Sequence, residues 1–294
     1  MISPKKVHQQ ELLFKLFIYF LSSCALIPLF LITFFIIAQG FTYISPLFFI
    51  TDSPAPMADT EFFELSRSTI SAAIGGIRNS FIGMIIIVGL ASIIAIPFGI
   101  LVAIYISENK NSLLSKLTLI CVDSLQGIPS IIFGIIANIW IVMTFKAYSA
   151  ISGSFALMIM MLPIIIKSSY ETLLLIPVAL KESALALGVP YSRVLLKIIL
   201  PAAAGGISSG IVLGISRVLG ETAPLLFTAF GNPYFSTNIF GPMETIAMQI
   251  YKNSTSPNAN LIANAWGASL ALAIIVLILN LIIKPFIDKI KIKF

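Results

Sequence analysis

Two residues of opposite charge interrupt a long apolar run in ISRVLGETAPLLFTAF, residues 215–230. Arg217 and Glu221 are four residues apart, so in a helix their side chains share a face and can pair. An arginine guanidinium presents a planar fork of donors that suits a passing oxyanion. Two interpretations stay open: the pair locks helix packing, or Arg217, Glu221 and Thr222 line the path of an anionic substrate.

A second polar stripe lies in VDSLQGIPSIIFGI, residues 122–135. Asp123, Gln126, Ser130 and Gly134 follow i, i+3, i+7, i+11 spacing, which places them on one side of a helix. Polar groups are costly in hydrocarbon and tend to face cavities or partners. We therefore expect Gln126 and Ser130 to line a pathway, and we interpret Asp123 as a snorkelling or capping residue at the cytoplasmic end.

The composition shows what class of protein these polar residues belong to. Of the 294 residues, 58% are hydrophobic and 10% are charged, and the mean hydropathy is +1.03. Soluble domains have about a quarter charged residues, so the chain is a polytopic membrane protein. The basic residues are scattered and form no face for nucleic acid. Cys24 and Cys121 fall in or beside apolar segments, where we expect them to pack.

The hydropathy pattern predicts an all-α protein with six transmembrane helices of about 20 residues each. The first, 16–38, is too long for a signal-peptide core and is interpreted as an uncleaved anchor. It lies between a cytoplasmic N-terminus, 1–15, and an external loop, 39–78. A transmembrane domain, 79–284, and a basic tail, 285–294, follow. The other predicted spans are 81–106, 119–144, 154–176, 202–229 and 263–283.

Charge distribution orients these spans. If the N-terminus is cytoplasmic, 13 of the 18 basic residues fall on the cytoplasmic side, four fall outside and Arg217 stays in the membrane. Such a bias is the positive-inside signal. Both termini are therefore expected to be cytoplasmic, in a multi-pass protein of the cell membrane.

Smaller features predict local structure. Gly206, Gly210 and Gly214 recur every four residues and should let another helix approach closely. The face formed by Met243, Ile246, Ala247 and Ile250 predicts either a short helix that lies on the membrane surface or touches a partner, or a solvated loop with one packed turn. Prolines inside five predicted spans should kink them; these are Pro28, Pro97, Pro129, Pro163 and Pro224.

The connection KESALALGVPYSRVLLKIILPA, residues 181–202, predicts a helix-turn-helix. Glu182, Ser183 and Ala184 begin a helix of strong formers, Gly188 supplies a left-handed residue that ends it, and Pro190 starts a second helix. Small side chains on such a unit allow it to sit deep in a partner's groove.

This connection resembles the EAA loop of ABC-importer permeases, E-A-A-x3-G-x9-I-x-L-P, at every spacing, with Ser183 in place of the central alanine. In that family the loop, here 181–201, docks on a separate ATPase. The resemblance implies a coupling role for the matching residues, which are Glu182, Ser183, Ala184, Gly188, Ile198, Leu200 and Pro201.

GIPSIIFGI, Lys167 to Pro177 and above all SRVLGETAPLLFTA look like the PstA-type permease of phosphate ABC importers. The resemblance runs from about residue 70 to the last span and implies the type I ABC importer permease fold. It also implies a PstC-type permease, a PstB-type ATPase dimer and an external phosphate-binding protein as partners. One departure is that Lys167 and a single acid, Glu171, stand where the family tends to carry arginine and paired acids.

The chain has no G-x-x-x-x-G-K-[ST] loop, and its single histidine, His8, lacks a partner for acid–base or metal chemistry. We expect a non-enzymatic subunit without a cofactor, whose partner uses ATP. An ABC permease for sulfate or molybdate is one alternative. Phosphate differs from sulfate because it carries a proton near neutral pH and can donate a hydrogen bond to an acid such as Glu221. An ion-coupled secondary carrier is another, although it needs no EAA spacing and often shows inverted repeats.

Overall fold

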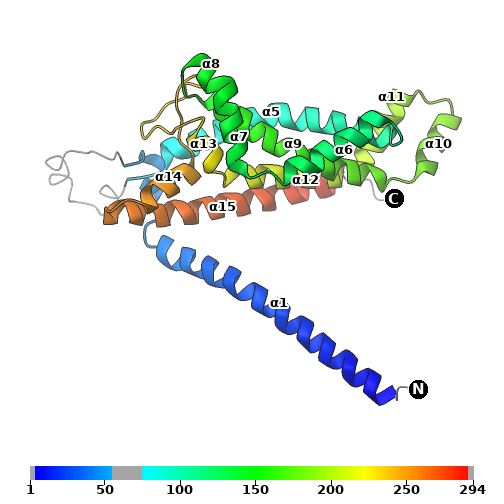
Figure 1. Cartoon of the computed structure of the whole chain (residues 1–294), viewed down its shortest axis with the longest axis horizontal. Coiled ribbons are helices and arrows are strands. Elements are labelled where there is room, and N and C mark those ends of the chain that lie inside the picture. Colours follow the sequence, from blue (N-terminus) through cyan, green and yellow to red (C-terminus); the bar gives the residue numbers. More distant parts are fainter. Residues whose placement is uncertain (1–3, 55–74, 291–294) are drawn as a thin grey trace.

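The computed structural model describes residues 4–54 and 75–290, and that part of the chain is almost entirely helical (Figure 1). It holds no β-strand, only an isolated bridge between Phe230 and Met243. The helices are α1 Pro4–Gly40, α2 Pro46–Ile50, α5 Arg78–Glu108, α6 Leu113–Gln126, α7 Ser130–Ala137, η1 Asn138–Val142, α8 Met143–Phe145, α9 Ala150–Leu174, α10 Val178–Ala186, α11 Tyr191–Val194, η2 Leu195–Ile199, α12 Leu200–Leu219, α13 Ala223–Leu226, α14 Ile246–Ser254 and α15 Ala259–Ile290.

The core of the bundle forms around α9. This helix packs along α5 on one side and along α12 on another, and α12 also packs on α15. Side chains of α5 and α9 dominate the interior because both helices are apolar around much of their circumference. Among the fully buried side chains are Met84, Ile87, Leu157, Met161 and Ile165.

Five helices of the described chain are long and apolar enough to cross a membrane, and a bent pair makes up to six. The bent pair is the predicted span 119–144, which is therefore not one straight helix. Residues 113–126 and 130–145 meet at 105°. Pro129 has no backbone N–H to continue α6, and it caps α7 instead. The predicted single face through Asp123, Gln126, Ser130 and Gly134 is consequently wrong.

The predicted span 202–229 differs at both ends. A continuous helical segment runs from Tyr191 to Leu219, so Pro201 does not separate loop from span. The π-helical turn η2 ends at Ile199, two residues before Pro201; its wider turn accommodates a residue that cannot donate the usual hydrogen bond. At the other end the helix stops before Gly220, and Pro224 lies in the first turn of the short α13 instead of kinking a span.

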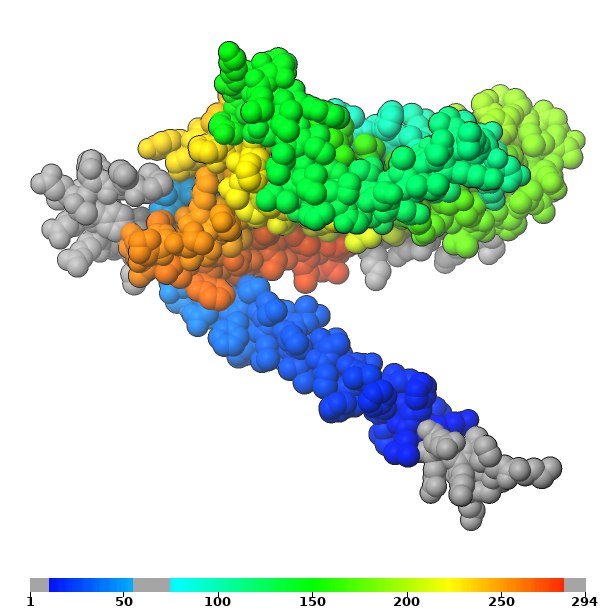
Figure 2. Space-filling view, viewed as in Figure 1, coloured from blue at the N-terminus to red at the C-terminus, as the bar shows by residue number. Residues whose placement is uncertain are grey.

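The first helix, α1, leaves the bundle at an angle, and it contacts α15 near Gly40 (Figures 1 and 2). A Cβ at Gly40 would lie 2.8 Å from the Trp266 carbonyl oxygen, so glycine permits this approach. The side chains of 11–34 are exposed, as suits a lipid-facing helix. Helix α1 begins inside the predicted N-terminal tail.

The predicted C-terminal tail, external loop and cysteine environments are next compared with the structure. Helix α15 continues through Ile290 into the predicted basic tail, whose residues 291–294 lie outside the described residues. So do residues 55–74 of the predicted external loop. Cys24 and Cys121 are free, but both are exposed, so the expectation that they pack in the interior is wrong.

The segment after α13 folds back onto the bundle. Ile246, Ala247 and Met248 are buried, and α14 packs on α15. The structure therefore confirms the helix and not the solvated loop, and this helix packs on α15 of the same chain. Buried Glu244 pairs with Lys252 at 3.1 Å, which lowers the cost of burying its charge.

The glycine stripe of α12 faces α9, as predicted. A Cβ at Gly206 would clash with Thr172, one at Gly210 would clash with Ser168, and one at Gly214 would lie 3.4 Å from Ile165. The bare backbone of α12 therefore fits against the α9 side chains. This contact fixes the helix that carries Arg217.

Gly210→Ala is expected to lower the free energy of unfolding by about 1–3 kcal/mol, because the added methyl group overpacks the α9–α12 contact. Gly89→Ala is the matched control, since a Cβ at Gly89 meets nothing within 4 Å. Thermal denaturation of the detergent-solubilised protein measures both variants. Equal midpoints for the two would contradict the close approach of α12 to α9.

Candidate functional site

Two helical breaks lie side by side in the bundle. The first, Gly127–Pro129, separates α6 from α7, and the second, residues 220–222, separates α12 from α13. The segments after the breaks pack on each other, because Gly134 of α7 lies against the backbone of Pro224. Asn138 Nδ2 also donates to the Phe227 carbonyl oxygen at 2.6 Å. All five residues expected in the pathway border one break or the other.

Arg217 and Glu221 flank the second break. Arg217 lies in the last turn of α12, where the helix dipole favours a cation. Glu221 lies beyond the end of α12, so the predicted pairing within one helix is not the geometry observed. The Arg217 Nε and Glu221 Oε1 atoms are 4.0 Å apart, and the side chains are 41% and 17% exposed. This contact is long, and within the described residues the guanidinium makes no hydrogen bond to another side chain.

Gln126, Ser130 and Thr222 complete the set. Gln126 ends α6 and its Nε2 donates weakly to the Pro163 carbonyl oxygen at 3.4 Å. Ser130 is half-buried in the first turn of α7, and the Thr222 carbonyl oxygen accepts from the backbone N–H groups of Leu225 and Leu226. Within the described chain, no hydrogen bond joins these three residues to Arg217 or Glu221. The structure thus places them at neighbouring breaks without linking them.

An ion pair missed by the sequence interpretation lies one turn before the first break. Lys167 Nζ of α9 is 2.6 Å from Asp123 Oδ1 of α6. Asp123 lies inside α6 and is paired, so it does not cap this helix, whereas its side chain, 55% exposed, remains compatible with snorkelling. The available signal was the presence of opposite charges within two predicted spans, since a charge in hydrocarbon usually has a partner.

This arrangement suits the passage of an anion. Irregular backbone at membrane depth is tolerated where it is buried in protein or lines a water-filled cavity. In many transporters, discontinuous helices form the substrate site in this way. Here the breaks bring Arg217 as a cationic donor, Glu221 as an acceptor and the hydroxyl of Ser130 to one region of the bundle.

The second candidate site projects from the opposite end of the bundle, as helices α10 and α11 (Figure 1). Helix α10 begins at Val178, four residues before the predicted start at Glu182. Gly188 has φ of +76°, which confirms the predicted left-handed residue. Pro190 caps α11 and so starts the second helix as expected.

The residues of this loop divide into buried and exposed sets. Ala184 lies on the buried face of α10, whereas Glu182 is exposed and has no ion pair within the described chain. Ser183 is exposed, and its hydroxyl donates to the Ala179 carbonyl oxygen at 2.6 Å, so it needs no other partner. The remaining three, Ile198, Leu200 and Pro201, are half-buried in the helix that continues into α12.

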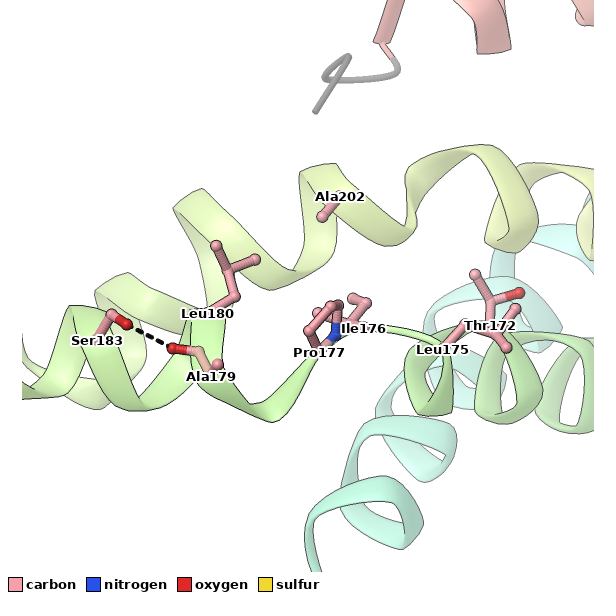
Figure 3. A pocket seen from close by; sticks show the side chains of 8 residues that line it. All are labelled: Thr172, Leu175, Ile176, Pro177, Ala179, Leu180, Ser183 and Ala202. Atoms are coloured by element: carbon pink, nitrogen blue, oxygen red, sulfur yellow. Dashed lines mark hydrogen bonds between the residues drawn. The ribbon is translucent and has the colours of Figure 1, made fainter.

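A cavity of about 740 Å³ lies between α10 and α12 (Figure 3). Its walls are mostly apolar and include Leu175, Leu180 and Ala202. Pro177 lies in the short linker that joins α9 to α10 at this cavity. The hollow therefore separates part of α10 from α12, while Ala184 of α10 joins the buried cluster that includes Ala203 of α12.

Residues 95–290 match the family model described as "Binding-protein-dependent transport system inner membrane component". The chain is 37% identical over 209 residues to the "Phosphate transport system permease protein PstA" of Xylella fastidiosa (strain 9a5c), covering 70% of this chain and 73% of that one. It is 35% identical over 241 residues to the protein of the same name from Pasteurella multocida (strain Pm70), covering 82% and 86%.

Solved structures show the same fold. A chain of a bacterial alginate ABC transporter, in complex with an alginate pentasaccharide-bound periplasmic protein, superposes with a TM-score of 0.58. The alignment covers 97% of this chain and 95% of that one at 15% identity. At this identity the likeness extends to the fold alone, which is that of an ABC importer permease.

Proposed function

Since the chain belongs to the binding-protein-dependent transport inner membrane components, and within them to the PstA-type permeases, we propose that it is a membrane subunit of an ATP-driven inorganic phosphate importer. It forms half of the translocation pathway and lies in the cell membrane. The chemistry at the two breaks supports an anionic cargo. The PstA relatives, similar over most of the chain, support phosphate as that anion.

The observation that carries the coupling role is the continuous helical segment from Tyr191 to Leu219. This segment joins the projecting loop to Arg217 without a break in the helix. A displacement of α10 and α11 therefore has a direct mechanical route to the second break. In this proposal, ATP-driven closure of the partner ATPases moves the loop, and the pathway opens alternately to the two sides.

The partners follow from this role. A PstC-type permease supplies the other half of the pathway, a PstB-type ATPase dimer binds ATP, and an external phosphate-binding protein delivers the substrate. This subunit holds no cofactor of its own. The N-terminal end of α1 and the C-terminal end of α15 point the same way as α10 (Figure 1), which supports cytoplasmic termini beside the ATPase.

Each predicted residue has a place in this scheme. The coupling set Glu182, Ser183, Ala184, Gly188, Ile198, Leu200 and Pro201 forms the docking unit and its junction with α12. The exposed Leu187, 84% accessible, adds an apolar contact for the ATPase groove. At the breaks, Arg217 contacts phosphate, and Glu221 orients the guanidinium or accepts the phosphate proton. Thr222, Ser130 and Gln126 line the adjoining path.

Radiolabelled phosphate uptake tests the proposed function. Cells that lack this chain should lose high-affinity uptake, and expression of the chain should restore it. Excess sulfate or molybdate should not compete. Competition by either anion would transfer the assignment to that cargo. Uptake that survives mutation of the partner ATPase but stops with a protonophore would instead indicate an ion-coupled carrier.

A further inference from the structure

One ion pair ties the coupling loop to a helix that the proposed coupling route does not use. Lys181 of α10 bonds to the carboxylate of Glu108, the last residue of α5. The Lys181 Nζ also lies 5.1 Å from the centre of the Tyr191 ring in α11. These three side chains, here called the brace, therefore join three helices.

The surroundings of the brace make its contacts stronger than those of an ordinary surface pair. The side chains of Lys181 and Glu108 are only 28% and 23% exposed, so water screens their attraction incompletely. A small cavity of about 110 Å³, lined partly by apolar Leu195 and Ile199, lies beside them. Glu108 is also at a helix C-terminus, where the dipole disfavours an acid and increases the need for a cation.

The chain gives α10 few other rigid connections. It is joined to α9 by the linker at Ile176 and Pro177 and to α11 by the turn at Gly188, and its close backbone contacts are with α11. The cavity of Figure 3 separates it from α12. Ala184 is its buried apolar anchor. The pairing with Glu108 is thus the polar contact that holds α10 to α5.

Helix α5 is well placed to pass motion on. It packs along α9, and α9 carries Lys167 and faces the glycine stripe of α12. A displacement that moves α5 together with α10 would therefore also shift α9, on which the helix that carries Arg217 packs. The continuous α11–α12 segment alone moves only one side of the pathway.

We propose that Glu108, Lys181 and Tyr191 are positioning residues that make α5 move as one body with the coupling loop. ATP-driven displacement then reaches the pathway along α5 and α9 as well as along α12. This inference rests on the proposed function, because it assumes that an ATPase displaces α10. None of the three residues contacts the substrate.

The first test measures coupling in the purified, reconstituted importer. Lys181→Met keeps the side-chain length but removes the charge, and it should lower phosphate transported per ATP hydrolysed about fivefold or more. The charge reversal Glu108→Lys with Lys181→Glu should regain most of the lost coupling. Tyr191→Phe keeps the ring contact with Lys181 but removes the hydroxyl that bonds to Glu108, so it should lower coupling less than Lys181→Met does. Lys116→Met, an exposed cation of the same end without an ion pair in the described chain, is the control.

The second test follows the motion directly, in complexes with the native brace and with Lys181→Met. After Cys24→Ala and Cys121→Ala, spin labels at Asn109 and at the exposed Val178 report the distance between the end of α5 and helix α10. The complex is compared in the nucleotide-free and vanadate-trapped states. The distance should stay constant with the native brace and should change on trapping in the Lys181→Met complex.

A changing distance with the native brace, or wild-type coupling in Lys181→Met, would overturn the inference. If Lys181→Met fails to assemble, the native-brace distance still decides the matter. Failure of the unmodified complex to transport phosphate would refute the proposed cargo instead, while the label distance would continue to test the brace.

Discussion

Gly188→Val should lower phosphate uptake about tenfold or more, because a β-branched residue in the left-handed region costs about 1–3 kcal/mol and each 1.4 kcal/mol is a factor of ten. Gly188 has φ of +76°, and a Cβ there meets nothing within 4 Å. The cost is therefore one of backbone conformation, not of a clash within the subunit. Relief of the strain would change the angle between α10 and α11 and misplace Glu182 for docking.

Gly188→Asn is the matched control, because asparagine tolerates the left-handed conformation better than valine does. It should retain much more uptake than Gly188→Val at equal membrane insertion. ATP hydrolysis stimulated by the phosphate-loaded binding protein should follow uptake in both variants. Normal uptake by Gly188→Val would reject the coupling role of this turn.

Arg217→Gln should reduce phosphate uptake by about 10- to 100-fold, the equivalent of the roughly 1.5–3 kcal/mol that a hydrogen bond to a charged group contributes. Glutamine keeps some hydrogen-bonding capacity but loses the charge and the planar fork. Arg217→Lys keeps the charge without the fork, so its phosphate uptake should lie between that of the wild type and that of Arg217→Gln. The weak contact with Glu221, at 4.0 Å, gives little reason to expect a large structural effect.

Two measurements separate a pathway role from a packing role. Membrane insertion and the thermal denaturation midpoint of Arg217→Gln should match those of the wild type, while uptake falls. Lys15→Gln removes an exposed cation from α1, without an ion pair in the described chain, and should leave uptake unchanged. Unchanged uptake in Arg217→Gln would mean that Arg217 interacts with Glu221 and not with phosphate.

The coupling loop was largely predictable from the chain itself. Gly188 and Pro190 determine backbone conformation locally, one through its freedom at positive φ and the other through its fixed φ, so their effects need no tertiary information. The glycine stripe of α12 was predictable for a similar reason, since spacing alone puts Gly206 and Gly210 on one face. Which helix would fill that face could not be read from the stripe.

The two helical breaks were harder to predict, because hydropathy reports how apolar a segment is and not the direction of its helix axis. The predicted spans 119–144 and 202–229 are both predominantly apolar, yet the chain turns by 105° in one and ends its helix before Gly220 in the other. A proline within such a run is compatible with a kink, a cap or a complete break. Contacts between α7 and α13 through Gly134 and Pro224 select the breaks.

By itself, the sequence determined that this protein is a helical membrane protein with a turn between two helices at Gly188, because apolar length, charge bias and the residues around Gly188 act locally. The permease class rests on the resemblance of residues 181–202 to the EAA loop. Only the tertiary structure decided that Asp123 meets Lys167, that Glu108 meets Lys181 and that Glu221 lies outside the helix of Arg217. These pairings join residues of different elements or depend on where a helix ends. They follow from the packing of whole helices, which no local pattern encodes.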